Sequence, residues 1–345
     1  MGGSDFHHGK IALLKRILSS SLFRFSLGFA LSGLSIFLAL RKVNISDLQR
    51  ALSQSDWRFM CFALFSVAIN VSMKVLRWKV LLGSSGKEAG CSKISMSFLA
   101  AQMLNSFLPV RAGEISRVYV MGRAGIGHAF VLGTIAVEKV MDLIAYSLLF
   151  VFLLFMMPLP KWIGASGTTI IVSVILLSAI VFLAAFYRNR LLALLDRLIA
   201  RAPKRYQPFL FHHLRIGLAS LDVLQDQAGR SWLAVSTAII WGTAVFTNQL
   251  VFKSLDIELP ATASLLLLIA LQAGISIPSL PGKLGIFEYI CILVLGLYGI
   301  EQALALSYGI LLHIIVYLPI ILTGILSYWL LEVSYREGKA ASTGK

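Results

Sequence analysis

Long uninterrupted apolar stretches dominate the pattern of hydrophobic and polar positions along this chain. A helix needs about 20 apolar residues to cross a hydrocarbon core about 30 Å thick. Stretches of suitable length and composition occupy residues 24–40, 58–76, 128–157, 163–187, 231–252 and 303–331. We predict that each is a membrane-spanning helix, the first being a retained signal anchor because no small-residue cleavage site follows it.

Two further apolar stretches, 94–124 and 261–300, are interrupted by proline and glycine. Irregular backbone at membrane depth is tolerated only where protein or a water-filled cavity surrounds it. Proline is favoured in the first turn of a helix, so a short helix is expected to begin near Pro109 and another near Pro281. The positive amino-terminal ends of two such helices would attract an anion.

An internal repeat links the two halves of the chain. Three short segments match in order at nearly one offset, 174, 172 and 174 residues. The matched pairs are 76–81 with 250–255, 108–113 with 280–285, and 125–126 with 299–300. With a cytoplasmic amino terminus, the helix at 128–157 would run outward and its partner at 303–331 inward. The repeats are therefore predicted to be inverted, as in many secondary transporters.

The predicted fold class is an all-α polytopic membrane protein built from two inverted-topology repeats. It would have about eight transmembrane segments, including broken or re-entrant helices. Residues 1–345 are read as a single membrane domain, with repeat 1 at about 57–157 and repeat 2 at about 231–331. Between them, 188–230 is read as a basic amphipathic helix on the cytoplasmic surface or as a solvated connector.

Composition excludes a soluble class and charge suggests an orientation. Hydrophobic residues make up 58% and charged residues 14% of the sequence, whereas soluble domains are nearer half apolar and a quarter charged. The net charge of +15 is read as loop bias, since basic residues gather in cytoplasmic loops. Placing both termini inside assigns 22 basic residues to inner segments (1–24, 77–93, 110–127, 188–230 and the tail) and 6 to outer loops. An inner (plasma) membrane location is predicted, with no nucleic-acid partner.

Charged residues inside the apolar stretches are the strongest functional signal. A charge at the bilayer centre costs about 2.5–3.5 kcal/mol on insertion scales, yet Glu138, Lys139 and Asp142 lie within 128–157. One interpretation is structural: Lys139 would pair with Asp142, and Arg111 with Glu114, merely to tie helices together.

The other interpretation is a cavity lining that binds a lipid headgroup. Arg111, Arg117 and Lys283 would bind phosphate, while Glu138, Asp142 and Glu288 would balance charge, contact the headgroup or carry a coupling proton. Asn105 would be a headgroup hydrogen-bonder or a helix cap, and His313 a packed residue or a proton relay. The complete candidate set is Asn105, Pro109, Arg111, Glu114, Arg117, Glu138, Lys139, Asp142, Pro281, Lys283, Gly285 and Glu288. No metal or disulfide is expected, because the histidines have no partner ligands at metal spacing and the cysteines show no paired spacing. No cofactor is expected.

Three motifs in order resemble the flippase-like membrane domain of lysylphosphatidylglycerol synthetases, a family with stand-alone members. They are Asn105-Ser-Phe-Leu-Pro109-Val-Arg111-Ala-Gly113-Glu114-Ile-Ser-Arg117, Glu138-Lys139-Val-Met-Asp142 and Pro281-Gly282-Lys283-Leu-Gly285-Ile-Phe-Glu288. Arg77-Trp78 followed by Leu81-Leu82 is similar to the family's second helix. The family usually has a second glycine where Lys283 stands, which would alter headgroup preference.

The resemblance covers nearly the whole chain and implies the translocation half of the synthetases without the soluble aminoacyl-transferase domain. The expected function is a lipid flippase for an aminoacylated phospholipid or a polyprenyl-phosphate-linked glycan, and not an enzyme. Two alternatives stay open: a membrane-embedded transferase acting on lipid-linked sugars, and a scaffold of a lipid or glycan synthesis complex. The expected partners are anionic membrane lipids, with a homo-oligomer or lipid and glycan synthesis enzymes as further options.

Overall fold

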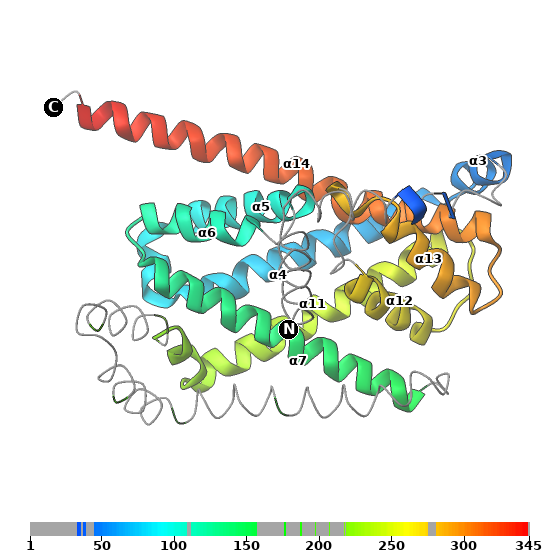
Figure 1. Cartoon of the computed structure of the whole chain (residues 1–345), viewed down its shortest axis with the longest axis horizontal. Coiled ribbons are helices and arrows are strands. Elements are labelled where there is room, and N and C mark those ends of the chain that lie inside the picture. The colour runs from blue at the N-terminus through cyan, green and yellow to red at the C-terminus, as the bar shows by residue number, and fades with distance from the viewer. Residues whose placement is uncertain are drawn as a thin grey trace, which may run out of the picture.

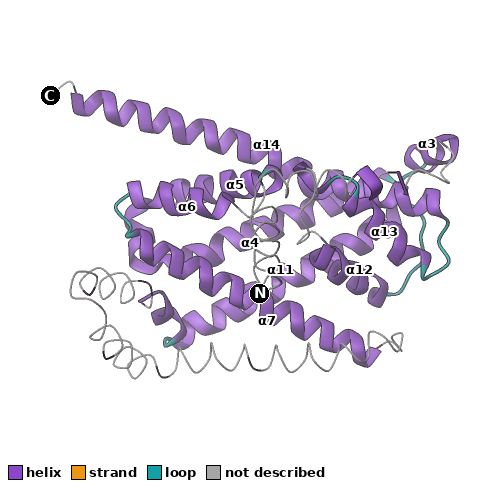
Figure 2. Ribbon diagram, in the orientation of Figure 1, coloured by secondary structure: helices purple, strands orange, loops and turns teal. Residues whose placement is uncertain are grey.

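The computed structural model describes residues 45–108, 112–156, 219–274 and 281–343, with single residues at 33–35, 37, 38, 176, 187, 197, 207 and 217. Within these residues every regular element is a helix (Figure 2). The predicted spans 24–40 and 163–187, and most of the connector 188–230, lie outside the described residues. The predicted all-α polytopic class is confirmed.

Four long helices form the frame of the molecule. They are α4 (Trp57–Ala89), α7 (His128–Met156), α11 (Gln227–Ser254) and α14 (Gln302–Thr343), and each contains an apolar stretch long enough to span a membrane. Their outer surfaces carry exposed large apolar side chains such as Phe65, Phe155 and Trp329. In water such a surface would be costly, whereas lipid tails accept it.

The span formed by α4 is longer than the 58–76 that we predicted from the sequence. The apolar part of α4 continues to Gly83, whose backbone is non-helical with φ at 56°. The sequence placed the end of this helix at residue 76, because Arg77 looked like the start of a basic loop. That assignment is wrong: Arg77 lies within the span, where its charge is neutralised by a neighbouring helix.

Two pairs of short helices fill the space between the long ones. α5 (Cys91–Phe107) and α6 (Ala112–Arg123) form one pair, and α12 (Ala261–Gly274) and α13 (Ile286–Gly296) form the other. At about 1.5 Å per residue, the 12, 14 and 11 residues of α6, α12 and α13 are too short to cross a bilayer. Figure 1 shows that the α5–α6 pair starts and ends at the left end of the molecule, and the α12–α13 pair at the right. Both pairs are therefore re-entrant hairpins.

The predicted start of the second short helix needs correction. Pro281 begins a 3-10 turn, η3 (Pro281–Lys283), and α13 starts only at Ile286, after Gly285. Gly282 and Gly285 have φ of 77° and 85°, a backbone conformation that glycine adopts without a steric penalty. Pro109, predicted to open the equivalent helix, lies outside the described residues.

The two halves have the same element order and opposite directions. Each half reads long, short, short, long, and α4 and α14 run from right to left in Figure 1, while α7 and α11 run from left to right. The contacts are reciprocal, since α4 packs on α11, α5 on α14 and α12 on α7. The glycine turn before the last helix of each half is also repeated. The Ile126 amide donates to the Met121 carbonyl, and 174 residues later the Ile300 amide donates to the Leu295 carbonyl.

A polar seam joins the two central helices. The Asn70 amide on α4 donates to the Ile240 carbonyl and to Thr243 Oγ1 on α11, at 2.5 and 3.0 Å. One turn away, Thr247 Oγ1 donates to Ser66 Oγ at 3.0 Å. Small polar contacts of this kind hold helices together in lipid, where apolar surface alone supplies no drive to associate.

Each half has its own apolar core, and each core includes part of the other half's central helix. The second-half core contains Ala63 and Val67 of α4, and the first-half core contains Leu233 of α11. Two small elements pack at the ends: α3 (Ile45–Ser53) against α14, and η2 (Ser220–Leu224) against α7. The predicted connector is therefore shorter than 188–230, because η2 and the first residues of α11 lie within that range.

Close packing between the halves predicts a specific sensitivity at Gly324. A Cβ atom there would lie 2.3 Å from Met103 Cβ and 2.8 Å from the Leu99 carbonyl oxygen. Gly324→Ala should therefore push α14 off α5 and cost about 1–3 kcal/mol of stability. Thermal unfolding in detergent measures the effect.

The matched control is Gly242→Ala on α11, where an added Cβ would have nothing within 4 Å. This change should be neutral or stabilising by up to about 1 kcal/mol, since alanine favours the helix. Equal melting temperatures for the two variants would contradict the close approach of α5 and α14.

Candidate functional site

The amino-terminal turn of α6 is held in place by a side chain from α5. Asn105 Oδ1 accepts a hydrogen bond from the Gly113 amide at 2.8 Å, and its Nδ2 donates to Glu114 Oε1 at 3.4 Å. A Cβ on Gly113 would lie 2.0 Å from the Ala101 carbonyl oxygen, so only glycine lets α5 and α6 approach this closely. Of the two roles predicted for Asn105, the structure shows the cap.

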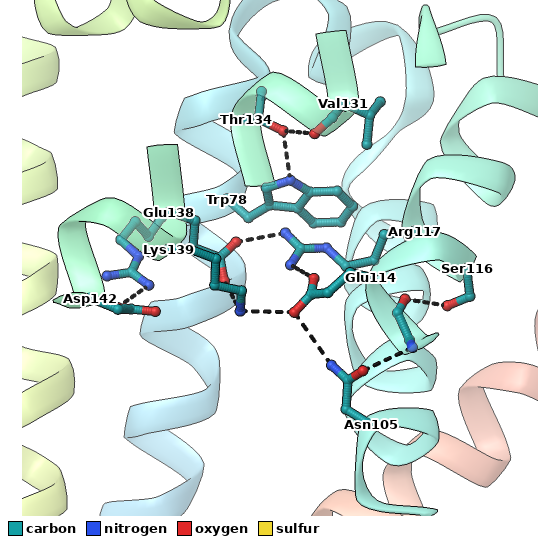
Figure 3. A network of polar contacts seen from close by, with 12 residues as sticks. Trp78, Asn105, Glu114, Ser116, Arg117, Val131, Thr134, Glu138, Lys139 and Asp142 are labelled. Atoms are coloured by element: carbon teal, nitrogen blue, oxygen red, sulfur yellow. Dashed lines mark hydrogen bonds and ion pairs between the residues drawn. The ribbon is translucent and has the colours of Figure 1, made fainter. Parts of the chain in front are cut away.

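Arg117 forms the buried centre of a charge cluster (Figure 3). Its Nη1 lies 3.0 Å from Glu114 Oε2 and its Nη2 lies 2.7 Å from Glu138 Oε2, with the side chain only 2% exposed. The guanidinium carbon lies 3.9 Å from the ring centre of Trp78 and 4.9 Å from that of Phe98. These ring contacts add to the ion pairs, and the buried guanidinium has almost no surface open to a headgroup.

The shortest ion pairs of Lys139 and Asp142 on α7 join it to neighbouring helices. Lys139 Nζ lies 2.8 Å from Glu114 Oε1 on α6 and 3.7 Å from Glu138 Oε1. Asp142 Oδ1 lies 2.8 Å from Arg77 Nη2 on α4. The predicted Lys139–Asp142 pair within α7 is therefore wrong, because each side chain meets a partner of opposite charge on another helix.

Arg77 is fully buried but incompletely bonded. Its Nη1 donates to Thr237 Oγ1 on α11 at 3.1 Å. Although its Nη2 is close to Asp142 Oδ1, neither atom makes a hydrogen bond of good geometry in the described part of the chain, and Arg77 Nε is also without a partner. Buried donors and acceptors are nearly always satisfied in folded proteins, so this corner of the cluster retains unused hydrogen-bonding capacity.

Lys74 is a functional candidate that the sequence analysis missed. It lies half-buried on α4, one turn before Arg77, and the charges acting on it most strongly include Asp142. Among the described residues it has no ion pair. The available signal was two cations at i, i+3 within an apolar helix, and ending that helix at residue 76 concealed it.

The cluster carries an excess of positive charge. Within the described residues its cations are Lys74, Arg77, Arg117 and Lys139, and its carboxylates are Glu114, Glu138 and Asp142. The buried arginines neutralise two carboxylates, while Lys139 and Asp142 remain 34% and 28% exposed. An anion could therefore approach the two lysines without displacing the buried pairs.

Contacts at equivalent positions fix how the two halves correspond. Trp78 on α4 donates from Nε1 to Thr134 Oγ1 on α7 at 3.2 Å. The residues 174 positions later, Phe252 on α11 and Tyr308 on α14, also touch, with ring centres 4.5 Å apart. α6 and α13, and likewise α7 and α14, begin 174 residues apart.

The second half lacks the central ion pairs at these corresponding positions. Arg77, Arg117, Glu138 and Asp142 correspond to Val251, Cys291, Leu312 and Val316. The first three of these belong to the second-half apolar core, and Val316 packs against it. The same arrangement of helices therefore forms without these charges. Apolar packing often replaces buried ion pairs at no loss of stability, so the first-half charges are not explained by folding alone.

The remaining predicted site residues are distributed differently. Glu288 caps Gly285 and contacts His313, and no ion pair in the described part of the chain joins it to the first-half cluster. Lys283 lies on η3, which packs against α5. Pro109 and Arg111 lie outside the described residues. No group of three or more histidine, cysteine or acidic side chains suited to a metal ion occurs in the described ranges.

Comparisons with known proteins agree with the membrane architecture. A family model described as the lysylphosphatidylglycerol synthase TM region matches residues 25–324. The chain is similar to a UPF0104 membrane protein of Pyrococcus horikoshii, with 22% identity over 315 residues covering 84% of this chain and 92% of the relative. It is also similar to a UPF0104 membrane protein of Methanocaldococcus jannaschii, with 26% identity over 237 residues covering 66% and 94%.

The asymmetry between the halves predicts how the cluster responds to loss of charge. Glu138→Gln leaves Arg117 buried without its nearer carboxylate and should cost about 3–5 kcal/mol of stability. Equilibrium unfolding in mixed micelles measures the loss. An exposed carboxylate, Glu258, provides the control, and Glu258→Gln should have almost no effect.

The double variant Arg117→Met with Glu138→Leu removes both charges and imitates the apolar second half. It should lose much less stability than Glu138→Gln alone, because no buried charge is left unpaired. If the double variant fails to fold, the cluster is a structural element that the first half cannot do without.

Proposed function

The chain belongs to the family of lysylphosphatidylglycerol synthase transmembrane regions, and we propose that it moves an anionic, phosphate-bearing lipid between membrane leaflets. The lipid headgroup would bind at the first-half charge cluster. The acyl chains would stay in the surrounding bilayer, where the exposed apolar surfaces of the long helices lie.

The observation that carries this proposal is the difference between the halves. Charges that the second half replaces with Val251, Cys291, Leu312 and Val316 are retained in the first half, despite the cost of placing ions at membrane depth. Ionisable residues within membrane segments generally mark a pathway for a substrate or an ion. A positive excess with unused donors on Arg77 suits a phosphate.

Each charged residue has a distinct proposed role. Lys74 and Lys139 would contact the phosphate, together with Arg77, and Arg117 would position the two glutamates rather than touch the lipid. Asp142, partly exposed beside Arg77, would accept from an ammonium group. A headgroup with both a phosphate and an amine, such as an aminoacylated phospholipid, therefore fits better than a phosphate-linked glycan. The phosphate contacts predicted for Arg111 and Lys283 remain predictions.

The inverted halves suggest how the headgroup would cross. The α5–α6 and α12–α13 hairpins enter from opposite ends of the molecule (Figure 1), and η3 of the second hairpin packs against α5 of the first. Rocking of one repeat against the other would open a shared polar site to each side in turn, as in transporters built from inverted repeats.

The test is leaflet exchange in proteoliposomes with fluorescent aminoacylated, acidic and polyprenyl-phosphate lipids. Lys74→Gln and Lys139→Gln should each slow exchange about tenfold, the effect of losing roughly 1.4 kcal/mol of charge-assisted binding. The control Lys253→Gln changes an exposed lysine at the end of α11 and should leave the rate unchanged.

Exchange that exceeds empty vesicles and falls only in the two cluster variants would support translocation through this site. No exchange of any lipid by folded protein would contradict the proposal. The transferase and scaffold alternatives would then be tested by assaying sugar transfer and by copurification.

A further inference from the structure

Glu288 and His313 form a buried pair at the start of the second re-entrant hairpin's return helix. Glu288 Oε1 lies 2.6 Å from His313 Nδ1, and Glu288 Oε2 accepts a hydrogen bond from the Gly285 amide at 2.7 Å. The imidazole ring is flanked by Phe287 and Tyr317, with ring centres 4.7 and 4.6 Å away. His313 Nε2 has no hydrogen-bond partner within the described residues.

This pair occupies the same place in the fold as the Glu114–Lys139 pair. Glu114 and Glu288 are each the third residue of their short helix, α6 or α13. Lys139 and His313 are each the twelfth residue of the long helix that follows, α7 or α14. In both halves, then, a carboxylate on the hairpin contacts a basic group on the next long helix, 2.8 Å away in the first half and 2.6 Å in the second.

The second half retains this one contact, whereas apolar residues or cysteine replace the two arginines, Glu138 and Asp142, and the uncharged Asn248 stands at the position of Lys74. The lysine of the first half is replaced by histidine, the side chain whose charge changes between about pH 5 and pH 8. α13 also packs directly on the α14 backbone, since a Cβ on Gly309 would lie 3.2 Å from Glu288 Cα and from Cys291 Cβ. One hairpin is thus held by a permanent ion pair and the other by a titratable one.

We propose that Glu288 and His313 form a proton-binding site that clasps the second re-entrant hairpin to α14. A proton taken from water adds to the imidazole at Nε2, giving an imidazolium whose Nδ1–H donates to the Glu288 carboxylate. Its release to water leaves a neutral ring and a weaker contact, because the ion pair is lost. This inference rests on the proposed function, for which it supplies a route to coupling with a proton gradient.

The other ionisable groups nearest the pair on its own two helices are phenols and a thiol. The ionisable side chains of α13 and α14 near the pair include Tyr289, Cys291, Tyr308 and Tyr317, and thiol and phenol groups are normally neutral near pH 7. α12 has no ionisable residue, and α5 carries only Cys91 and Lys93, at its far end. The remaining charged groups on elements that touch α13, α14 or α5 include Asp47 and Arg50 on α3, Lys74 and Arg77 on α4, Lys253 on α11 and Lys283 on η3.

The reactivity of Cys291 can report when the contact between Glu288 and His313 weakens. Cys291 lies on α13, fully buried against Gly309 of α14, while the other two cysteines are exposed and can be changed to serine. In the Cys61→Ser, Cys91→Ser background, alkylation of Cys291 is measured from about pH 5 to pH 8. His313→Lys should form a permanent ion pair with Glu288, as in the first half, and His313→Gln should form no ion pair.

The three chains are compared at each pH, and the alkylation rate of the chain with His313 should change from that of one variant to that of the other as the pH rises. The chain with His313 should be as protected as His313→Lys at low pH and should react about tenfold faster, like His313→Gln, at high pH. The charge of the imidazolium alone acts in the other direction, since a nearby cation favours the reactive thiolate. Glu288→Gln, which keeps the histidine, should also abolish this change with pH. Reactivity that parallels one of the two His313 variants over the whole range would overturn the proposal.

Lipid exchange under an imposed pH gradient separates this inference from the proposed function. Exchange by the unaltered chain should respond to the gradient, and exchange by His313→Lys should not. Exchange that does not respond to the gradient in either chain would contradict the proton site but not the proposed translocation. Absence of exchange would contradict translocation, while the change of Cys291 alkylation with pH would still decide whether the proton site exists.

Discussion

A charge inside a membrane is costly unless it is paired, and the first half of this molecule is organised around that constraint. Arg117 and Glu138, 2.7 Å apart, tie α6 to α7, and the Trp78 ring covers the guanidinium from α4. Once this pair is buried, Glu114 is held where Lys139 can reach it from α7. The cluster thus sets the position of the re-entrant helix and leaves its lysines at the edge. Because ionic interactions are stronger in a medium of low dielectric constant, an anion reaching those lysines would be bound more firmly than at a water-exposed surface.

The inverted second half serves as an internal control for this interpretation. It builds the same four-helix arrangement in the opposite direction with Val251, Cys291, Leu312 and Val316 at the positions of the central charges. What both halves share is a carboxylate at the start of the returning short helix and a basic side chain on the next long one. The shared contact holds each returning short helix against the next long helix, and in the second half its basic side chain is the histidine of the proposed proton site. The contacts present in one half only are best explained by what that half binds, which is why the site and its translocation role are proposed there.

Much of the fold could be predicted from the sequence because membrane crossing imposes a length on apolar stretches and because the repeat left matches such as Gly125–Ile126 with Gly299–Ile300. Proline and glycine likewise marked both hairpins. The ion-pair partners could not be predicted, since spacing along one helix favours neighbours such as Lys139 and Asp142, whereas packing offered each a partner on another helix. Lys74 and Arg77 were missed because an arginine close to several lysines resembles the start of a cytoplasmic loop. Only Asp142 on α7 explains why Arg77 is buried. The Glu288–His313 contact joins residues 25 apart, beyond any local pattern.

The central claim is that the first-half charges hold a lipid headgroup, and a structure determined in nanodiscs containing an aminoacylated anionic phospholipid tests it most directly. The account predicts headgroup density within hydrogen-bonding distance of Lys74, Arg77 and Lys139, with the ammonium end toward Asp142. A cluster that stays closed around its own ion pairs, with ordered lipid only on the outer apolar faces, would contradict it.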